Sequence, residues 1–408
     1  MKKLILPLGL IFAATSIAWL ILGSTIFART YSFQSELKSK VASSWGVAQQ
    51  QFPPTASYAQ ESPAWVNQSA EKPASTKQIT VSQAVSLPLQ SSRVDVTLDL
   101  EHRQKGLLWY STYVVVFDGN YKFTNDTHQE RVVTFRLPFP AEQAIYDDAV
   151  LLVDNQPLSW RNEGNSASAS ASVPSGKTVM VHAAYRSQGL DSWHYNFGGN
   201  VAQVRDFKLH IKTNFKDIDF PDNTLSPTSK FENGGGWELN WSYKNLVSGY
   251  QIGLSMPEKL QPGPLAGQIS YFAPVSLFFF FFLMFIITAL RGIELHPMNY
   301  FFLAGAFFAF HLLLAYLVDH ISIHLAFAVC SLVSIFLVIS YLRLAVGLRF
   351  AALEAGMAQF VYLVLFSYAF FFKGFTGLAV TIGSIVTLFV VMQITGRIRW
   401  AEKFAAIR

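Results

Sequence analysis

Apolar residues are concentrated in two zones of the chain, Leu4–Phe27 and the part after Tyr271, with a polar stretch of ordinary composition between them. The first zone contains no charged residue and exceeds the length of about 20 residues that a helix needs to cross a bilayer. The second zone divides into five further runs of similar length: Tyr271–Leu290, Met298–Leu317, Ile323–Leu342, Phe350–Phe372 and Phe375–Ile394. We therefore predict a membrane protein with one N-terminal transmembrane helix and a five-helix C-terminal transmembrane bundle.

The middle zone alternates between apolar and polar residues with a period of two, which is the pattern of half-buried β-strands. The apolar residues that share a face are Val94, Val96, Leu98 and Leu100 in one segment, Phe207, Leu209 and Ile211 in a second, and Trp237, Leu239, Trp241 and Tyr243 in a third. Turn signals such as Asp118-Gly119-Asn120 and Pro174-Ser175-Gly176 separate such segments at short intervals. This pattern predicts a large β-sandwich-like region, formed by one or two antiparallel sandwiches.

Two segments of the middle zone have less distinct patterns. SASASASV alternates weakly and is predicted to be a strand beside KTVMVHAAY, or else a low-complexity linker. SFQSELKSKVASSW is predicted to continue the first helix, and the Gln-, Ser-, Ala- and Pro-rich stretch after it is predicted to be a linker or an extended wrap. The expected parts are 1–28 (anchor), 29–78 (helix and linker), 79–268 (β-rich domain), 269–396 (five-helix bundle) and 397–408 (basic tail).

The positive charges predict the orientation of the spans, because short cytoplasmic loops are rich in Lys and Arg. If the first helix runs outward, the cytoplasmic pieces carry Lys2, Lys3, Arg291, Arg343, Arg349, Arg397 and Arg399, together with Lys403 and Arg408. The opposite short loops contain only Lys373 as a permanent positive charge. We therefore expect both termini in the cytoplasm and residues 30–268 outside it. A cleaved signal peptide would leave five spans, but its apolar core has only about 7–15 residues, so an uncleaved anchor is favoured.

Composition narrows the class of protein. With 51% hydrophobic and only 14% charged residues, the chain is too apolar for a soluble globular protein. The net charge of +5 arises in part from the cations predicted at one membrane face, so it does not indicate a nucleic-acid partner. The single cysteine, Cys330, allows neither an intramolecular disulfide nor a cysteine metal cluster. The motifs GxxxxGK[ST], HExxH and GxSxG are missing from the sequence, and we expect neither an enzyme nor a cofactor.

A polar stretch, RGIELHPMNY, separates the second and third predicted spans. Pro297 suits the first turn of a helix, where its missing N–H is not needed, and Arg291 is expected to hold the preceding span at the cytoplasmic face. His296 either titrates or binds lipid headgroups, or it is an ordinary interfacial loop residue, which we favour. Glu354, near the same face, is expected to pair with Arg349 or to extend to water.

Other polar residues are candidate sites. One possible metal-ligand set consists of Asp319, His320 and His324. A second possibility is that Asp319 and His320 form a proton-accepting pair. The simpler interpretation is that these residues form a solvated turn. His311, Gln359 and Gln393 lie within spans and would line a path in a transporter, although a hydrogen bond to a neighbouring helix is the simpler explanation for His311. DSWHYNFGGN in the middle zone is a possible ligand-binding edge, but packing is the commoner role of such aromatic residues.

The second half of the chain resembles a known family in three places. The tetrad Leu295-His296-Pro297-Met298 follows the second span, Asp319-His320 follows the third, and Thr395-Gly-Arg-Ile-Arg-Trp400 follows the last. In this topology, they resemble the CreD family of inner membrane proteins, with this chain a divergent member. The resemblance implies a bacterial inner-membrane protein involved in envelope integrity and in envelope-stress or antibiotic responses, without implying a biochemical activity.

The leading hypothesis is thus a non-enzymatic envelope protein, whose partners are the lipid bilayer and an unidentified envelope component or protein bound by the β-rich region. A transporter or channel is one alternative. The other is a membrane sensor that signals through a partner, since the predicted cytoplasmic tail is too short to hold an effector domain.

Overall fold

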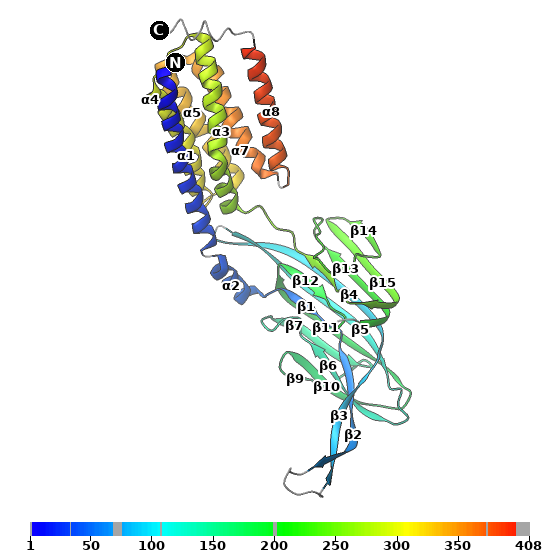
Figure 1. Cartoon of the computed structure of the whole chain (residues 1–408). Helices are drawn as coiled ribbons and strands as arrows, with labels where there is room; N and C mark the ends of the chain where they lie inside the picture. The colour runs from blue at the N-terminus through cyan, green and yellow to red at the C-terminus, as the bar shows by residue number, and fades with distance from the viewer. Residues whose placement is uncertain are drawn as a thin grey trace. The chain divides into compact units, whose positions relative to one another are not determined.

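The computed structural model describes residues 2–32, 34–67, 76–106, 108–198, 202–372 and 374–396 (Figure 1). The chain divides into two compact units. The membrane unit comprises Met1–Leu37, Gln104–Leu108 and Leu260–Arg408, and the β unit comprises Lys38–Arg103 and Trp109–Lys259. The boundary after the β unit therefore lies before the predicted position at residue 268, because the residues from Pro262 onward are already helical.

The described part of the membrane unit contains six helices that are long and apolar enough to cross a membrane, as predicted. They are α1 (Lys2–Tyr31), α3 (Pro262–Arg291), α4 (Pro297–Leu317), α5 (Ile323–Ala345), the fifth span and α8 (Thr376–Thr395). The fifth span, Phe350–Phe371, is an irregular helix. It consists, in chain order, of π-helical η1 (Phe350–Ala355), α6 (Gly356–Gln359), π-helical η2 (Phe360–Leu365), α7 (Phe366–Tyr368) and 3₁₀-helical η3 (Ala369–Phe371).

Small residues bring α1 and α3 close together. A Cβ atom added at Gly263 would lie 2.6 Å from the Thr30 hydroxyl oxygen, and one added at Gly267 would lie 3.1 Å from the Phe27 ring. One turn further along, Gly23 lies against Tyr271. Within a bilayer, helices associate by such close packing, since burial of apolar side chains gains little against lipid.

The β unit begins within α2 (Gln34–Trp45), the helix predicted after the first span. Its strands are β1 (Gln49–Gln51), β2 (Thr55–Asn67), β3 (Thr76–Leu87), β4 (Leu89–Lys105), β5 (Leu108–Thr124), β6 (Arg131–Pro138), β7 (Tyr146–Val153), β8 (Gln156–Pro157), β9 (Arg161–Asn162), β10 (Ser166–Val173), β11 (Thr178–Leu190), β12 (Ser192–Tyr195), β13 (Ala202–Thr213), β14 (Ser229–Asn233), β15 (Gly236–Ser248) and β16 (Ile252–Ser255). They form sheets of the order β14-β15-β13-β4-β5-β11-β7-β8, β3-β2-β6-β10-β9 and β1-β12-β16.

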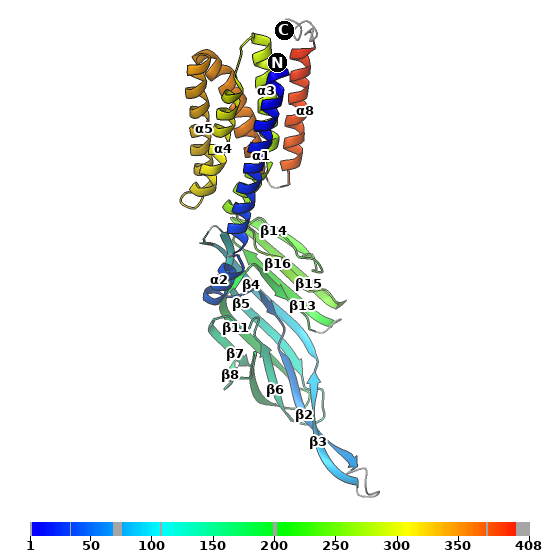
Figure 2. The same ribbon diagram turned by 60° about the vertical axis from the view of Figure 1, so that its left-hand side comes forward.

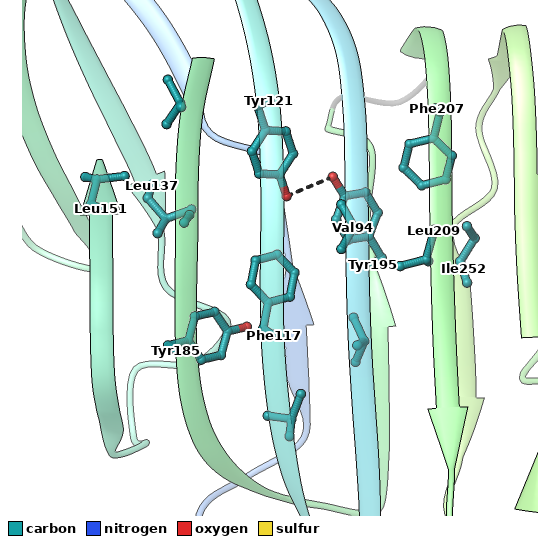
Figure 3. Close-up of a cluster of buried hydrophobic side chains, with 14 of the residues drawn as sticks. Val94, Phe117, Tyr121, Leu137, Leu151, Tyr185, Tyr195, Phe207, Leu209 and Ile252 are labelled. Atoms are coloured by element: carbon teal, nitrogen blue, oxygen red, sulfur yellow. Dashed lines mark hydrogen bonds between the residues drawn. The ribbon is translucent and has the colours of Figure 1, made fainter. Parts of the chain in front are cut away.

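A single hydrophobic core joins the three sheets (Figure 3). Val94 of β4, Phe117 of β5 and Phe135 of β6 belong to it, together with Tyr195 of β12 and Ile252 of β16. The alternation read from the sequence is reproduced, because Val94, Val96 and Leu98 are at most 2% exposed and the residues between them face away from the core. The predicted β-rich region is thus confirmed, and all three sheets contribute to one packed core.

The prediction of a linker is wrong for residues 49–67, which form β1 and β2. Polar side chains are buried here because they find partners: Gln49 donates to the Ser187 hydroxyl (2.8 Å), and the Tyr185 hydroxyl donates to Gln51 Oε1 (2.7 Å). SASASASV is strand β10, paired along its whole length with β6, so the linker alternative for this segment is also excluded. Residues 68–75 lie outside the described part of the chain.

Strands β2 and β3 extend beyond the rest of their sheet as a two-stranded ribbon (Figure 2). β2 pairs with β6 only from Thr55 to Tyr58, whereas its pairing with β3 continues to Asn67. A ribbon of two strands with no third neighbour is marginally stable by itself.

Candidate functional site

The RGIELHPMNY segment forms the connection between α3 and α4. α3 ends at Arg291, and Gly292 follows with a φ of 68°, the left-handed conformation that often terminates a helix. His296 is the N-cap of α4, because its Nδ1 accepts a hydrogen bond from the Met298 amide (3.2 Å). Pro297 occupies the start of the helix, and Leu295 is buried in the core of the membrane unit. Geometry thus gives the tetrad a structural role in starting α4.

An ion pair joins this connection to the fifth span. Arg291 lies 2.5 Å from Glu354, whose side chain is only 17% exposed. The sequence-based expectation paired Glu354 with Arg349, but the partner comes from α3 because the start of the fifth span packs beside the end of that helix. Asn299 of α4 is held similarly, since the Tyr341 hydroxyl on α5 donates to its side-chain oxygen (2.8 Å).

The candidate metal ligands are not brought together. Among the described residues, His, Cys, Asp and Glu form no group of three that would hold a metal ion. Asp319 instead lies 3.3 Å from Arg29 of α1, and His324 packs its ring 5.2 Å from that of Phe371. His320 lies in the turn between α4 and α5. Arg29 also donates to the Ala315 carbonyl (2.7 Å). Sequence analysis had missed Arg29, the charged residue nearest the end of the first apolar run.

Gln359 belongs to a buried polar chain that crosses three helices. Its amide donates to Ser334 Oγ on α5 (2.7 Å), which in turn donates to the Ala306 carbonyl on α4 (2.7 Å). Gln359 stands between the two π-helical segments of the fifth span, and its buried Oε1 finds no hydrogen-bond partner within the described ranges. Isolated π-helical turns are rare and occur frequently at functional sites. Gln393, by contrast, is exposed on α8, so the structure does not place it in the same path.

His311 is fully buried in α4. Its Nδ1 lies 2.9 Å from the Phe307 carbonyl oxygen, one turn earlier in the same helix, rather than binding a neighbouring helix as expected. The Trp19 ring of α1 packs edge-on against it, with 5.6 Å between ring centroids. The other ring nitrogen, Nε2, is buried and has no hydrogen-bond partner among the residues that the structure describes.

The positively charged residues that predict the orientation of the spans lie at the helix ends where the sequence analysis expects them. Arg343 is in the last turn of α5, and Arg349 immediately precedes the fifth span. The loops that carry Arg291, Arg343 and Arg349 therefore lie at the same end of the predicted bundle. Lys2 and Lys3 begin α1, whereas Arg397 and Arg399 lie outside the described residues.

In the β unit, the DSWHYN segment is strand β12. Trp193 and Tyr195 are buried in the core, and the Tyr195 hydroxyl donates to that of Tyr121 (3.4 Å; Figure 3). His194 lies on the opposite face of the strand over Gly253, and burial lowers its pKa below the usual range. Packing thus accounts for these three side chains.

A pocket of about 180 Å³ opens beside Tyr195. It lies between the five-stranded and eight-stranded sheets and is mostly apolar, with polar groups from a few side chains. Its lining includes Pro53, Leu87, Leu89, Phe123, Tyr195, Phe197, Gln203, Arg205 and Phe207. A few polar groups around an apolar, aromatic concavity are the usual character of a ligand site, although this one is smaller than the 300–1,000 Å³ or so of drug-sized sites.

Comparison with known families gives one match: residues 267–401 match the family described as inner membrane protein CreD. No curated protein matches the chain. Among solved structures, a putative nutrient binding protein from Legionella pneumophila is similar over 58% of this chain and 76% of its own, with 11% identity and a TM-score of 0.34. An M1 zinc metallopeptidase from Deinococcus radiodurans is similar over 42% of each chain, with 10% identity and a TM-score of 0.23. The chain thus spans less than half the length of that peptidase.

Proposed function

We propose, from the match of residues 267–401 to the family described as inner membrane protein CreD, that the protein maintains the integrity of the bacterial cell envelope. In this proposal, the β unit lies outside the cytoplasm and binds an envelope component, while the six spans anchor it. The function is binding, without catalysis.

The β unit carries the proposal. It has a hydrophobic core of its own, built from all three sheets, and therefore has the means to fold as a binding domain beside the membrane unit. Its pocket offers apolar and aromatic side chains with Gln203 and Arg205 among the lining residues. This combination favours a ligand with an apolar part and an acceptor or anionic group.

The charge distribution supports an extracytoplasmic β unit. The two loops with Arg291, Arg343 and Arg349 belong in the cytoplasm by the positive-inside rule. The helix α3 ends at the first of these loops, so it begins at the opposite face of the membrane. The β unit directly precedes α3 in the chain and is therefore expected at that opposite face.

Complementation of a deletion strain tests the proposal. We expect the deletion strain to be more sensitive than its parent to detergents and cell-wall antibiotics, and the full-length protein to restore resistance. Leu89→Arg, which places a charge in the pocket lining, is expected to abolish the rescue. Val132→Arg is the matched control, because Val132 is 65% exposed on the same unit. Equal rescue by both variants, at equal protein levels, would exclude the pocket as the binding site.

A transporter is the second candidate, favoured by the buried chain from Gln359 to Ala306 and the π-helical turns beside it. Polar groups within the bilayer mark transport paths in many membrane proteins. The test measures the flux of small solutes into proteoliposomes. Loss of this flux in Gln359→Leu, but not in Gln393→Leu on α8, would favour a transporter over binding alone.

A further inference from the structure

In the described part of the chain, five polar side-chain atoms of the helices α1, α3 and α4 are buried without a hydrogen-bond partner. They are Trp19 Nε1, Arg29 Nε, Ser270 Oγ, Ser276 Oγ and His311 Nε2. An unpaired buried polar atom costs about 1–3 kcal/mol, and the lipid chains around the helices offer no hydrogen-bond partner to offset this cost. Their position therefore needs a physical explanation.

The contacts between α1 and α3 put Trp19 and Ser276 at the same level. Gly263 lies against Thr30, Gly267 against Phe27, and Gly23 against Tyr271. Each contact is about one helical turn from the previous one. One further turn brings Trp19 beside Val275 and Ser276.

The contacts between α3 and α4 bring His311 to this level too. The hydroxyls of Thr288 and Tyr300 are 3.4 Å apart, and the rings of Phe280 and Phe307 are 5.0 Å apart. One turn further along each helix are Ser276 and His311. Because Trp19 also packs against His311, the three helices present an indole N–H, a hydroxyl and an imidazole nitrogen at one level.

Polar groups continue from this level to the end of α4. His311 and Ala315 are four residues apart and so share a face of α4, and Asp319 lies in the turn just beyond the end of that helix. Arg29 donates to the Ala315 carbonyl and pairs with Asp319, and Ser270 lies on α3 between Ser276 and that end. We name this row, from Asp319 and Arg29 through Ser270 and Ser276 to Trp19 and His311, the polar seam.

The remaining titratable groups on the helices around His311 are few. α1 contributes Lys2, Lys3, Arg29 and Tyr31, and α3 contributes Arg291 and Tyr271, which is 48% exposed. α4 contributes Tyr300 and Tyr316, and Asp319 and His320 lie in the turn after it. α5 contributes His324, Cys330, Tyr341 and Arg343. Asp319 is the only carboxylate in this set, and its partner Arg29 offsets its charge.

The hydrogen-bonding roles along the seam are complementary to water. The contact of His311 Nδ1 with the Phe307 carbonyl places the proton of the neutral ring on Nδ1, so Nε2 is an acceptor. The Trp19 indole only donates, and serine hydroxyls do both. One water molecule can accept from the indole and donate to the imidazole, and buried waters typically make about three such bonds.

We propose that the polar seam is a water- and proton-binding site, in which His311 Nε2 accepts a proton that enters from the Asp319 end. The proton comes from bulk water at that end and passes between waters held by Ser270 and Ser276. The imidazole gains one proton and one positive charge, and it returns the proton by the same route. This inference does not depend on the envelope role.

Deuterium exchange at the carbon-bound Cε1 proton of histidine tests the site, because it requires both protonation of the ring and access of water. The full-length protein in lipid nanodiscs is incubated in D₂O, and each histidine is followed by mass spectrometry of its peptides. We expect His311 to exchange within about tenfold of the rate of exposed His296, despite being fully buried in the protein.

Two leucine variants test the route. Ser270→Leu fills the seam and is expected to slow exchange at His311 by about tenfold or more, without changing His296 or His182. Ser331→Leu is the matched control, since Ser331 is a buried serine on α5 whose hydroxyl bonds its own helix at the Phe327 carbonyl. Ser270→Val repeats the test with less added volume if the leucine variant does not purify as a folded protein.

The proposal is overturned if His311 does not exchange while His296 does. It is also overturned if Ser331→Leu slows His311 as much as the Ser270 variants do, since access would then follow general loosening of the bundle rather than the seam.

Discussion

Arg291 combines two effects in one side chain. Its charge contributes to the positive bias of one set of loops, and its guanidinium group pairs with Glu354, a carboxylate that is mostly buried. Arg291 pairs with Glu354 Oε1, and Glu354 Oε2 has no hydrogen-bond partner among the described residues. The residue therefore matters for stability after insertion as well as for orientation.

Removing Arg291 is expected to destabilise the folded bundle. In Arg291→Ala the buried Glu354 carboxylate loses its partner, at a cost of about 1–3 kcal/mol. Arg343→Ala is the control, because it removes a cation at the same end and Arg343 is exposed and shows no ion pair among the described residues. Thermal unfolding of the purified proteins in detergent should show a lower midpoint only for Arg291→Ala. Equal midpoints would mean that the ion pair contributes nothing.

Asp206 makes the stability of the β unit depend on acid pH. Arg93 donates two hydrogen bonds of 2.7 Å to its carboxylate, and Ser91 donates a third, so the pKa of Asp206 lies below its usual 3.8. A carboxyl whose pKa is lower when folded stabilises the fold fully above the unfolded pKa. That contribution is lost as the pH falls from 3.8 through the folded value.

We expect Asp206→Asn to have a lower unfolding midpoint than the wild type near neutral pH, and the gap to close between about pH 5 and about pH 2. The comparison uses the near-ultraviolet circular dichroism of the full-length protein, to which the buried Trp and Tyr side chains of the β unit contribute. A gap that stays constant with pH would show that the asparagine acts through packing instead.

At the scale of elements, the apolar pattern and the contacts between helices define different properties of the membrane unit. Their apolar lengths determine which segments are spans, but the close approach of α1 to α3 depends on Gly263, Gly267 and Gly23 meeting particular side chains of the partner helix. Nothing in the apolar pattern distinguishes these glycines from Gly305, where an added Cβ would meet nothing within 4 Å.

The two kinds of glycine are expected to respond differently to leucine. Gly267→Leu drives the new side chain into the Phe27 ring and should destabilise the protein by about 1–3 kcal/mol. Gly305→Leu enters open space on a helix surface and should be neutral or slightly stabilising, since leucine is the better helix former. Thermal unfolding in detergent measures both. A loss of stability in Gly305→Leu as large as in Gly267→Leu would show that the contact is not specific.

For the whole molecule, the distribution of positive charge predicts which face of the membrane the β unit occupies. By the positive-inside rule, we expect the β unit outside the cytoplasm. A reporter that is active only outside the cytoplasm, inserted in the turn at residues 154–155 between β7 and β8, is expected to be active. The same reporter fused after Arg408 is expected to be silent, and a cytoplasmic reporter should give the opposite result. Cytoplasmic activity from the β7–β8 turn would reverse the whole topology.

The sequence determined by itself the six spans, the β-rich character of the middle zone and the start of α4 at Pro297, because each depends on local properties: apolar length, residue alternation and a missing amide proton. Only the tertiary structure decided that Gln49 and Gln51 belong in strands, that Glu354 pairs with Arg291, and that Trp19, Ser276 and His311 meet at one level. These arrangements join residues far apart in the chain. Their energies come from partners that satisfy a buried polar group, and no local pattern of residues specifies such partners.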